Sequence, residues 1–457
     1  MKASGGHGGE SDPVGHALFT DLYELTMLQA YFEEGMDREA VFSLFVRRLP
    51  PNRNYLLACG LETVLDYLEH VRFGESDIAY LRTLGRFSEP FLEWLAAFRF
   101  TGEVSAVPEG TPVFANEPIL EVVAPLPQAQ LVETFVMNQI HLQTMIASKA
   151  ARVVTAAQGR DVVDFGARRY HGIDAAMKAA RASYIAGVAA TSNVLAGKRY
   201  GIPVAGTMAH SYVQAHEDEM EAFRAFARVY PDTVLLIDTY DTLRAVRKVI
   251  DMAHALGGDF KVSGLRLDSG DLAALSREAR RMLDDAGLQR VQLVASGNLD
   301  EYRVAQLVGE GAPFDTFGVG TAMGVSSDAP SLDIAYKLAE YGGRGRVKLA
   351  KDKPVYPGRK QVFRVEADGR DAHDVIGRYE ESLPGRPLLR PVMCEGGRLP
   401  DATPSLEAVR AYARAQIERL PAHVRALEPA DPPYPVRASD ALLRYQEQVA
   451  RNYRELD

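Results

Sequence analysis

Cysteine is scarce in this chain, which has only Cys59 and Cys394 in 457 residues. Two cysteines cannot build a cysteine zinc site or a disulfide framework, and their scarcity favours a reducing compartment. No apolar run is long enough to cross a bilayer, and residues 1–16 lack the apolar core of a signal peptide. We therefore expect a disordered N-terminal tail over 1–16, a cytoplasmic protein and no membrane contact.

An excess of positive charge is also missing. The formal net charge is −9, which leaves no electrostatic footprint for nucleic acid. An anionic ligand would have to be held by local devices such as helix N-termini and single arginines. Hydrophobic residues make up 47% of the chain, enough for a large core and one or two smaller domains.

What the sequence does contain, from about residue 160, is a repeated unit. A short apolar run ends in a polar or glycine cluster and gives way to an amphipathic helical stretch. Strands that alternate with helices predict a parallel sheet with right-handed crossovers, and six runs favour a barrel over the alternative, an open doubly wound sheet. The runs are DVVDFG (161–166), IPVAGT (202–207), TVLLIDT (233–239), GLRLDSGD (264–271), VQLVASG (291–297) and DTFGVGT (315–321).

The regions on either side of this repeat have a different pattern. Glycine, proline and alternating apolar residues over 101–124 are typical of antiparallel strands, and 345–366 indicates a hairpin. We therefore divide the chain into five parts, the last a peripheral helical cover. They are the tail (1–16), an N-terminal α+β domain (17–127), the α/β barrel (128–340), a β-hairpin segment returning to the N-terminal domain (341–402) and a helical C-terminal extension (403–457).

Each run of the repeat is apolar at its start and ends in polar residues. In a barrel, the carboxyl ends of all strands open on one face, where barrel enzymes hold their chemistry. This pattern predicts an active site there, although loops after strands are often polar for no functional reason. The residues are Asp164, Thr207, Asp238, Asp268, Asp271, Ser296 and Thr321.

The run GLRLDSGD carries the densest charge. Asp271 is predicted to cap the following helix. Asp268 would point into the barrel mouth, where a carboxylate can hold Mg²⁺ directly or through water, or orient a ribose hydroxyl. Arg266 lies on the same face of the strand. Its partner would be Asp268 or another acid, or else a ligand carboxylate or phosphate.

Glycine turns follow two late strands. FGVGT, with Gly318, Gly320 and Thr321, exposes backbone N–H groups that suit a phosphate, and Gly297 with Asn298 forms a second such turn. After the first run, Phe165 and Arg168 would suit an aromatic acid, or belong to an ordinary surface loop.

His210 follows the run that ends at Thr207, and His216 lies six residues further on. Two histidines on one zinc-binding helix need a spacing near four, so we do not expect a metal site here. The acidic residues over 217–221 are predicted to form a solvated helix face. His210, flanked by Thr207 and Ser211, is left as a candidate for proton transfer or nucleophilic attack.

These segments together resemble the nicotinate phosphoribosyltransferases, of the type II phosphoribosyltransferase family. The resemblance covers most of the chain in order, and its GTMAHS and LDSGD blocks are the specific ones. It implies an irregular, TIM-like α/β barrel joined to an N-terminal β-rich domain, in a homodimer whose active sites are shared between subunits. The segments are FTDLYELTM (19–27), DFGARR, ATSNVLAGKRYGIPVAGTMAHS (190–211), DTYDT (238–242), RLDSGD, ASGNLDE, FGVGT and KLAKDKPVYPGRKQVFR (348–364).

The resemblance also implies roles for individual residues. His210 matches the histidine that ATP phosphorylates, and Asp241 looks like the acid that orients it. Asp268 matches an acid near Mg²⁺ and the ribose. Tyr23 matches a ring contact that reaches across the dimer, Phe165 the aromatic that stacks on the pyridine, and Thr207 and Arg266 nicotinate contacts. Thr321 matches the 5′-phosphate cradle, together with Gly318 and Gly320.

The implied reaction transfers phosphoribose from 5-phosphoribosyl 1-diphosphate to nicotinate in a ligase-type, ATP-assisted step of NAD salvage. Relatives that use nicotinamide place an aspartate where Ser192 stands here, and that charge would repel a carboxylate. The alternatives are a nicotinamide phosphoribosyltransferase, a quinolinate phosphoribosyltransferase, which wants a denser cluster of basic residues and no ATP-linked histidine, and a catalytically silent ligand-binding relative.

Overall fold

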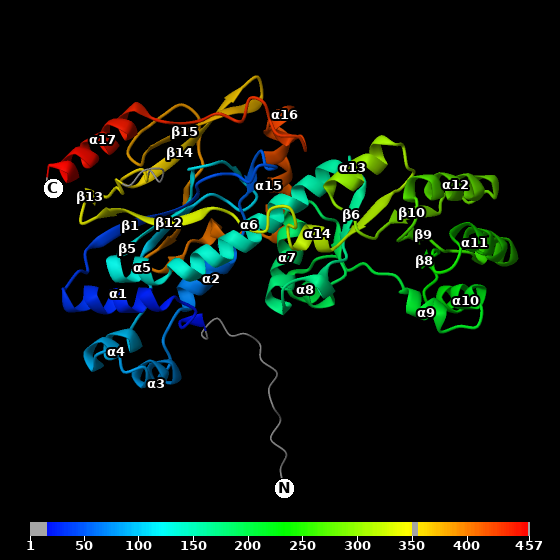
Figure 1. Ribbon diagram of the computed structural model, residues 1–457, viewed down its shortest axis with the longest axis horizontal. Coiled ribbons are helices and arrows are strands. Elements are labelled where there is room, and N and C mark those ends of the chain that lie inside the picture. The colour runs from blue at the N-terminus through cyan, green and yellow to red at the C-terminus, as the bar shows by residue number, and fades with distance from the viewer. Residues whose placement is uncertain (1–15, 350–354, 456–457) are drawn as a thin grey trace, which may run out of the picture. The chain divides into compact units, whose positions relative to one another are not determined.

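The computed structural model describes residues 16–349 and 355–455, and these fall into two compact units. Unit 1 comprises residues 1–144, 331–424 and 429–457, and unit 2 comprises 145–330 and 425–428. The boundary at residue 144 falls inside the long helix α6 (Glu133–Ala156). The tail predicted over 1–16 lies outside the described residues except for His16 (Figure 1).

Unit 1 is built on two sheets. The larger has seven strands in the order β13-β12-β1-β5-β3-β17-β18, all pairs antiparallel. Its central strands are runs of β-branched and aromatic residues buried along almost their whole length, as such residues favour. The strands are β1 (Glu39–Val46), β3 (Glu103–Ala106), β5 (Pro118–Pro125), β12 (Ile334–Tyr341), β13 (Arg344–Gly345), β17 (Arg390–Cys394) and β18 (Gly397–Arg398).

The smaller sheet corrects the predicted hairpin over 345–366. β13 pairs with β12 in the larger sheet, whereas β14 pairs with β15 in the smaller sheet. The hairpin is therefore formed by β14 and β15. Its turn is Asp368-Gly369, both at positive φ, which is the conformation that Asp-Gly favours between antiparallel strands. The strands, in the order β16-β14-β15-β19, are β14 (Lys360–Ala367), β15 (Arg370–Arg378), β16 (Arg386–Pro387) and β19 (Val436–Ala438), and β2 (Leu56–Leu57) with β4 (Pro112–Val113) forms a separate pair.

Helices cover these sheets, and the C-terminal segment is more than a cover. β19 pairs in parallel with β15, and the Tyr434 ring stacks on Phe114 with 4.0 Å between ring centroids. The extension predicted to be helical over 403–457 does contain the helices α15, α16 and α17, and it also contributes this short strand to the smaller sheet. The helices of unit 1 are α1 (Leu22–Glu33), α2 (Leu61–His70), α3 (Glu75–Thr83), α4 (Glu89–Ala96), α5 (Leu126–Leu131), the 3₁₀ turn η4 (Pro400–Ala402), α15 (Leu406–Arg419), α16 (Ala422–Arg425) and α17 (Asp440–Arg454).

Unit 2 contains the predicted parallel sheet, with the strand order β7-β6-β11-β10-β9-β8. The barrel predicted from the sequence is not closed. Within the described residues the sheet stays open between β7 and β8 and forms a curled half-barrel. The run 202–207 contributes a single parallel bridge, Thr191 to Val204, rather than a strand. The strands are β6 (Asp161–Asp164), β7 (Ala190–Thr191), β8 (Val234–Leu236), β9 (Gly264–Leu267), β10 (Gln292–Ala295) and β11 (Thr316–Val319).

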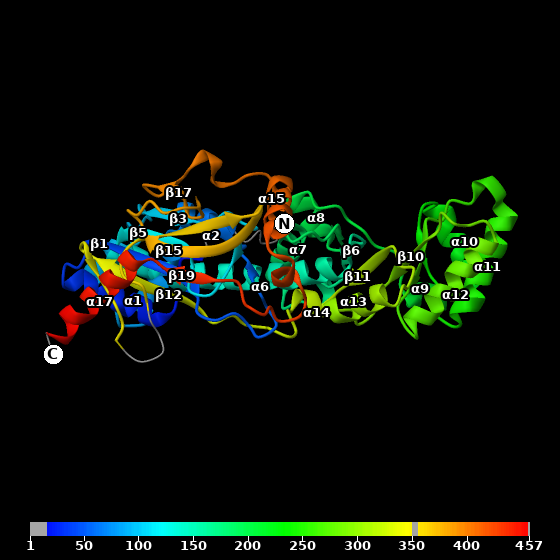
Figure 2. The same cartoon turned by 90° about the horizontal axis from the view of Figure 1, so that it is seen from above.

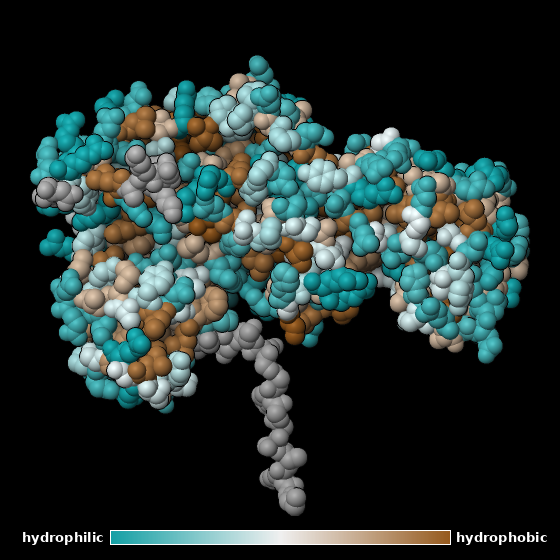
Figure 3. All heavy atoms as spheres, in the orientation of Figure 1, coloured by the Kyte–Doolittle hydropathy of each residue, from teal (hydrophilic) through white to brown (hydrophobic). Residues whose placement is uncertain are grey.

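Amphipathic helices connect these strands. α10, α11 and α12 lie side by side in both ribbon views, and hydrophilic side chains line the outer margin of α11 and α12 (Figures 1, 2 and 3). Among the described residues, no helix combines the length and the apolar character needed to span a bilayer. The helices are α7 (Ile173–Ile185), α8 (Val194–Tyr200), α9 (His210–Gln214), α10 (Glu219–Val229), α11 (Thr242–Leu256), α12 (Leu272–Asp285), α13 (Glu301–Gly309) and α14 (Thr321–Gly324), with the 3₁₀ turns η2 (Ala167–Arg169) and η3 (Gly257–Asp259).

Candidate active site

The carboxyl ends of the unit 2 strands bring the predicted site residues to one edge of the sheet. β8, β9 and β10 pair in register, with Leu236 beside Arg266 and Leu267 beside Ala295. Because the strands are parallel, the residues that follow them share this edge.

His210 is the first residue of the five-residue helix α9. Its half-buried ring is tied by Nδ1 to the Thr239 hydroxyl at 3.1 Å, and Thr239 stands just beyond the end of β8. Asp241, predicted to orient this ring, instead accepts a hydrogen bond from the Arg244 amide at 2.8 Å and caps α11. The sequence did not single out Thr239, although Thr239 lies in the same DTYDT segment as Asp241, the acid predicted to orient His210.

Two carboxylates stand beside each other at the ends of β8 and β9. Asp238 Oδ2 accepts hydrogen bonds from the Asp268 amide at 3.0 Å and from the Ser269 hydroxyl at 2.5 Å. Asp268 Oδ1 accepts one from the Ser296 hydroxyl, at the end of β10. Since Thr239 follows Asp238 directly, these contacts connect His210 to Asp268 along the strand ends.

Gly297 packs directly behind Asp268. A Cβ at this position would lie 1.9 Å from the Asp268 carbonyl oxygen, and φ is +86°, so both space and conformation demand glycine. Asn298 also has positive φ, at 50°. The predicted glycine turn is therefore present, and it fixes the backbone of the acid.

Arg266 is a half-buried cation at the site. One Nη donates to the Met208 carbonyl at 2.9 Å, and Nε is buried with no hydrogen-bond partner among the described residues. Burial lowers the pKa of this guanidinium, and the attraction of Asp268 and Asp238 opposes that shift. The acids act at a distance and form no ion pair with Arg266 in the described structure, so the predicted alternative of a pairing with Asp268 is not found.

An aromatic ring lies beside this cation. The Arg266 guanidinium carbon is 5.8 Å from the centre of the Phe165 ring, and Arg168 is close enough to depress the pKa of Arg266 further. Gly318 makes room for the ring, because a Cβ there would lie 2.4 Å from it. Gly318 thus lies behind Phe165, whereas Gly320 ends the turn before α14.

Asp164, one of the polar residues predicted at the strand ends, holds the loop that carries Phe165. It accepts hydrogen bonds from the Gly166 amide at 2.9 Å, Tyr170 at 2.5 Å and Thr191 at 2.8 Å. Burial raises the pKa of Asp164, and these three donors counteract that shift.

The other predicted residues of unit 2 are at the same edge. Ser192 follows β7 and donates its amide to the Asp164 carbonyl at 2.8 Å. Thr207 precedes α9, and its hydroxyl donates to the Met208 carbonyl at 3.3 Å. Ser211 and Thr321 are exposed at the starts of α9 and α14.

Comparisons with known proteins match the whole of this arrangement. Residues 18–141 match the nicotinate phosphoribosyltransferase N-terminal domain, 161–362 the nicotinate phosphoribosyltransferase family and 381–446 the corresponding C-terminal domain. The chain is 57% identical to nicotinate phosphoribosyltransferase pncB2 of Mycobacterium tuberculosis, over 93% of this chain and 92% of that one. The chain belongs to the nicotinate phosphoribosyltransferase family.

Two further relatives support this membership. A nicotinate phosphoribosyltransferase of Bacillus subtilis is 43% identical, over 82% of this chain and 78% of that protein. The crystal structure of human nicotinic acid phosphoribosyltransferase superposes with a TM-score of 0.84 at 30% identity, covering 94% of this chain and 99% of that one.

The family motif at the N-terminus lies in unit 1. Tyr23 is exposed on α1, and its hydroxyl donates to Glu133 at the start of α6. Burial raises the pKa of this phenol, as do the neighbouring carboxylates Glu133, Glu24 and Asp21.

Asp238 and Asp268 form a candidate magnesium site. Among the described residues there is no group of three or more His, Cys, Asp or Glu side chains that could hold a metal ion. Magnesium needs less than that, since one or two carboxylates and the oxygens of a bound phosphate satisfy it. Asp238 Oδ1 is buried without a hydrogen-bond partner in the described structure, beside Asp268, and this orphaned oxygen fits such an ion.

His216 and the acids behind it complete the segment. His216 Nδ1 lies 2.9 Å from the Tyr212 carbonyl, within a helical turn. The prediction of a solvated helix face is wrong at Glu219, which is buried and pairs with Lys248 at 3.2 Å.

Proposed function

We propose that this chain transfers phosphoribose from 5-phosphoribosyl 1-diphosphate to nicotinate, with the assistance of ATP, and so produces nicotinate mononucleotide and diphosphate for NAD salvage. Family membership supports the reaction class. The observation that carries the choice of substrate is the half-buried Arg266, whose buried Nε has no partner in the described structure and whose guanidinium lies beside Phe165.

Nicotinate is a flat ring that bears a carboxylate, and these two side chains offer one group for each part. The aromatic face of Phe165 suits a pyridine, and the planar guanidinium suits a carboxylate. Ser192, at the end of β7, adds no negative charge to the same edge. A neutral amide would leave this half-buried cation without a counter-charge, so nicotinamide is disfavoured.

His210 is the proposed nucleophile toward ATP. When Nδ1–H donates to Thr239, the lone pair resides on Nε2. Nε2 attacks the γ-phosphorus, the bond between that phosphorus and the bridging oxygen breaks, and ADP leaves with the electron pair. The phosphohistidine is later hydrolysed by water. Imidazole suits this step because it is nucleophilic while neutral near physiological pH.

Asp238 and Asp268 would hold Mg²⁺ at the diphosphate of the phosphoribosyl donor, and the ion supplies charge stabilisation for the leaving diphosphate. The turns at Gly297 and Gly320–Thr321 offer backbone N–H groups to the phosphates. The roles of the chain's own residues are to orient the ribose, fix the donor and hold the ring of nicotinate against the reacting carbon.

The active unit would be a homodimer with shared sites. Exposed apolar side chains surround the starts of α7 and α8, next to the ends of β6 and β7, and a hydrophobic patch is visible beside α8 in Figure 3. Such a patch is typical of an interface. Tyr23, exposed on α1, would reach the partner's site. The patch residues are Ile173, Val194, Leu195 and Val204.

Labelling with γ-³²P-ATP tests the proposal. We expect an acid-labile protein label that is lost in His210→Ala and retained in His216→Ala, the histidine of the same segment that contacts a carbonyl of its own helical turn. Nicotinate should stimulate turnover of this label when the phosphoribosyl donor is present. A chain that forms nicotinate mononucleotide at full rate in His210→Ala, or that prefers nicotinamide, would contradict the proposal.

A further inference from the structure

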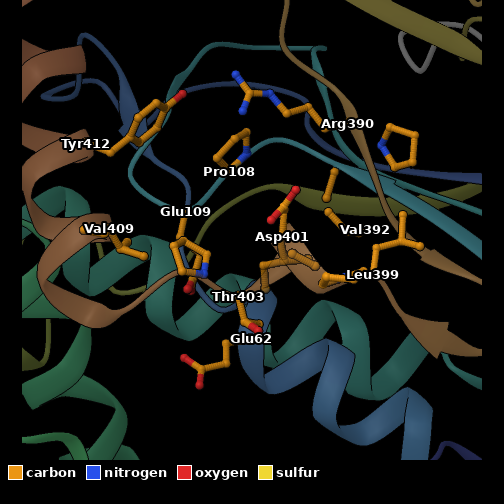
Figure 4. Close-up of a pocket in the computed structure, with 17 residues that line it drawn as sticks. Glu62, Pro108, Glu109, Arg390, Val392, Leu399, Asp401, Thr403, Val409 and Tyr412 are labelled. Carbon is orange, nitrogen blue, oxygen red and sulfur yellow. The ribbon is translucent and has the colours of Figure 1, made fainter.

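Unit 1 contains a cavity of about 620 Å³ that the proposed reaction does not use. It is bounded by the start of α2, the turn between β3 and β4, strand β17, η4 and α15 (Figure 4). Small-molecule sites typically have volumes of roughly 300–1,000 Å³. The cavity therefore has the size of a ligand site, and the strand-end residues of unit 2 are not among those that line it.

One cation at the cavity edge has no partner. Arg390 is exposed, and the described residues offer its guanidinium neither a hydrogen bond nor an ion pair. Nearby arginines differ in this respect. Arg386 forms two hydrogen bonds of 3.0 Å with the buried Asp371, and Arg419 pairs with Asp371 and Glu366. Arg390 is thus available to a planar anion.

Positive charge continues into a neighbouring hollow. A second cavity, of about 470 Å³, shares Arg390 and Tyr412 with the first and is also lined by Arg386 and Arg419. Figure 4 shows the Tyr412 hydroxyl and the Arg390 guanidinium pointing toward each other at the edge of the first cavity. Arg390 stands between the two hollows and offers donors to an anion at their junction. The Tyr412 hydroxyl beside it is already hydrogen-bonded to the Thr111 hydroxyl at 3.2 Å.

The rest of the first cavity has a different character. Pro108, Val392, Leu399 and Val409 give it apolar walls, as a flat ring requires, and Glu62 and Glu109 also line it. Asp401 faces into the space between them in Figure 4 and has no hydrogen-bond or ion-pair partner in the described structure. A carboxylate only accepts hydrogen bonds, so it would select an amino or hydroxyl group on the ligand.

We propose that this cavity is a second ligand site, which binds a nucleoside 5′-monophosphate. The phosphate lies on Arg390, beside Tyr412, the base lies between the apolar walls, and an amino or hydroxyl group of the nucleoside donates to Asp401. An inorganic anion would leave the apolar volume unfilled, and a free nucleoside would leave Arg390 without a counter-ion. The proposal does not depend on the reaction at the strand ends.

Isothermal titration calorimetry of the full chain with adenosine 5′-monophosphate tests this site. We expect Arg390→Ala to weaken binding at least tenfold, while Arg344→Ala, which removes another exposed arginine of the same sheet, leaves it unchanged. Thr321→Asp, which would repel a phosphate at the ends of the unit 2 strands, should also leave this binding in place. Thermal melting of each variant verifies that it is folded.

Three results would overturn the proposal. Binding that Thr321→Asp removes and Arg390→Ala does not would place the nucleotide at the strand ends. Adenosine binding as tightly as its monophosphate would remove Arg390 from recognition, and inorganic phosphate binding as tightly would remove the apolar walls. Asp401→Asn should weaken the monophosphate less than Arg390→Ala does, because the amide still accepts a hydrogen bond.

Discussion

At the scale of single residues, the proposed contact between Arg266 and the nicotinate carboxylate can be tested separately from the other proposed roles. Arg266→Gln removes the cation, and we expect the KM for nicotinate to rise about 10- to 100-fold, since a hydrogen bond to a charged group contributes about 1.5–3 kcal/mol. The preference for nicotinate over nicotinamide should fall with it. Steady-state kinetics with both substrates measure the effect, and Arg277→Gln, a surface change on α12, is the control. An unchanged preference would mean that another group reads the carboxylate.

Gly297 offers a second residue-scale prediction, with an internal control. Gly297 and Gly159 have the same φ of +86°, but a Cβ at Gly159 would meet nothing within 4 Å. Gly159→Ala should therefore cost only about 1–2 kcal/mol, the price of the left-handed conformation. Gly297→Ala must also displace the Asp268 backbone, so we expect it to lower the free energy of unfolding further and to reduce activity. Chemical denaturation and rate measurements on both variants compare them, and equal losses of stability would contradict the steric argument.

At the scale of elements, helix α11 decides what Asp241 does. Asp241 caps α11 as Asp271 caps α12, through hydrogen bonds of 2.8 and 3.1 Å from the amides three residues on. Replacing either by alanine should cost about 1 kcal/mol of stability. We expect both variants to keep the γ-³²P label on His210, because the ring is held by Thr239. Loss of the label in Asp241→Ala alone would restore the orienting role that the family resemblance implies.

The junction of α1 and α6 predicts a pH dependence of stability. Glu24 of α1 is buried against Thr134 of α6, and its pKa rises from 4.5 to about 7, mainly through burial. The folded state therefore holds a proton that the unfolded state releases between these values, so the stabilising contribution is complete below pH about 4.5 and is lost as the pH rises through about 7. Hydrogen bonds from Thr20 and Thr134 to the carboxylate limit the loss.

Glu24→Gln should remove this trend. We expect the variant to resemble the parent chain at low pH and to be more stable by about 1–2 kcal/mol at pH 8, where the parent holds a buried charge. Unfolding by denaturant at several pH values measures it. Glu34→Gln, an exposed change at the end of the same helix, should leave the pH profile unaltered, and a parallel profile for Glu24→Gln would refute the assignment.

For the molecule as a whole, the sequence predicted what local patterns can specify. Five of the six apolar runs became strands of unit 2, Asp271 became a helix cap, and His210 and Asp268 came to one sheet edge. The sequence did not predict how segments that lie far apart in the chain pair with each other. β7 has two residues and so carries no periodicity, and the opening of the sheet between β7 and β8 depends on packing that no single run encodes.

The site shows the same division. The type and order of the polar residues identified the edge of the sheet. Which of two neighbouring residues contacts His210 depends on the direction of their side chains, which the sequence does not show. Thr239 and Asp241 both follow β8, and only the start of α11 turns Asp241 toward a backbone amide. Gly318 was predicted to serve a phosphate because of its place in a glycine turn, and only the packing of Phe165 showed that the ring needs its missing side chain.

The parallel pairing of β19 with β15 has a genetic consequence. The strand lies about twenty residues from the end of the chain, and Tyr434 just before it donates to the buried Asp374 at 3.0 Å. A reading frame that stopped near codon 430 would still encode every residue of the candidate site at the strand ends of unit 2. The resulting protein would nevertheless lack β19, which pairs with β15, and the Tyr434 ring, which stacks on Phe114. We therefore expect late nonsense mutations in this gene to behave as null alleles.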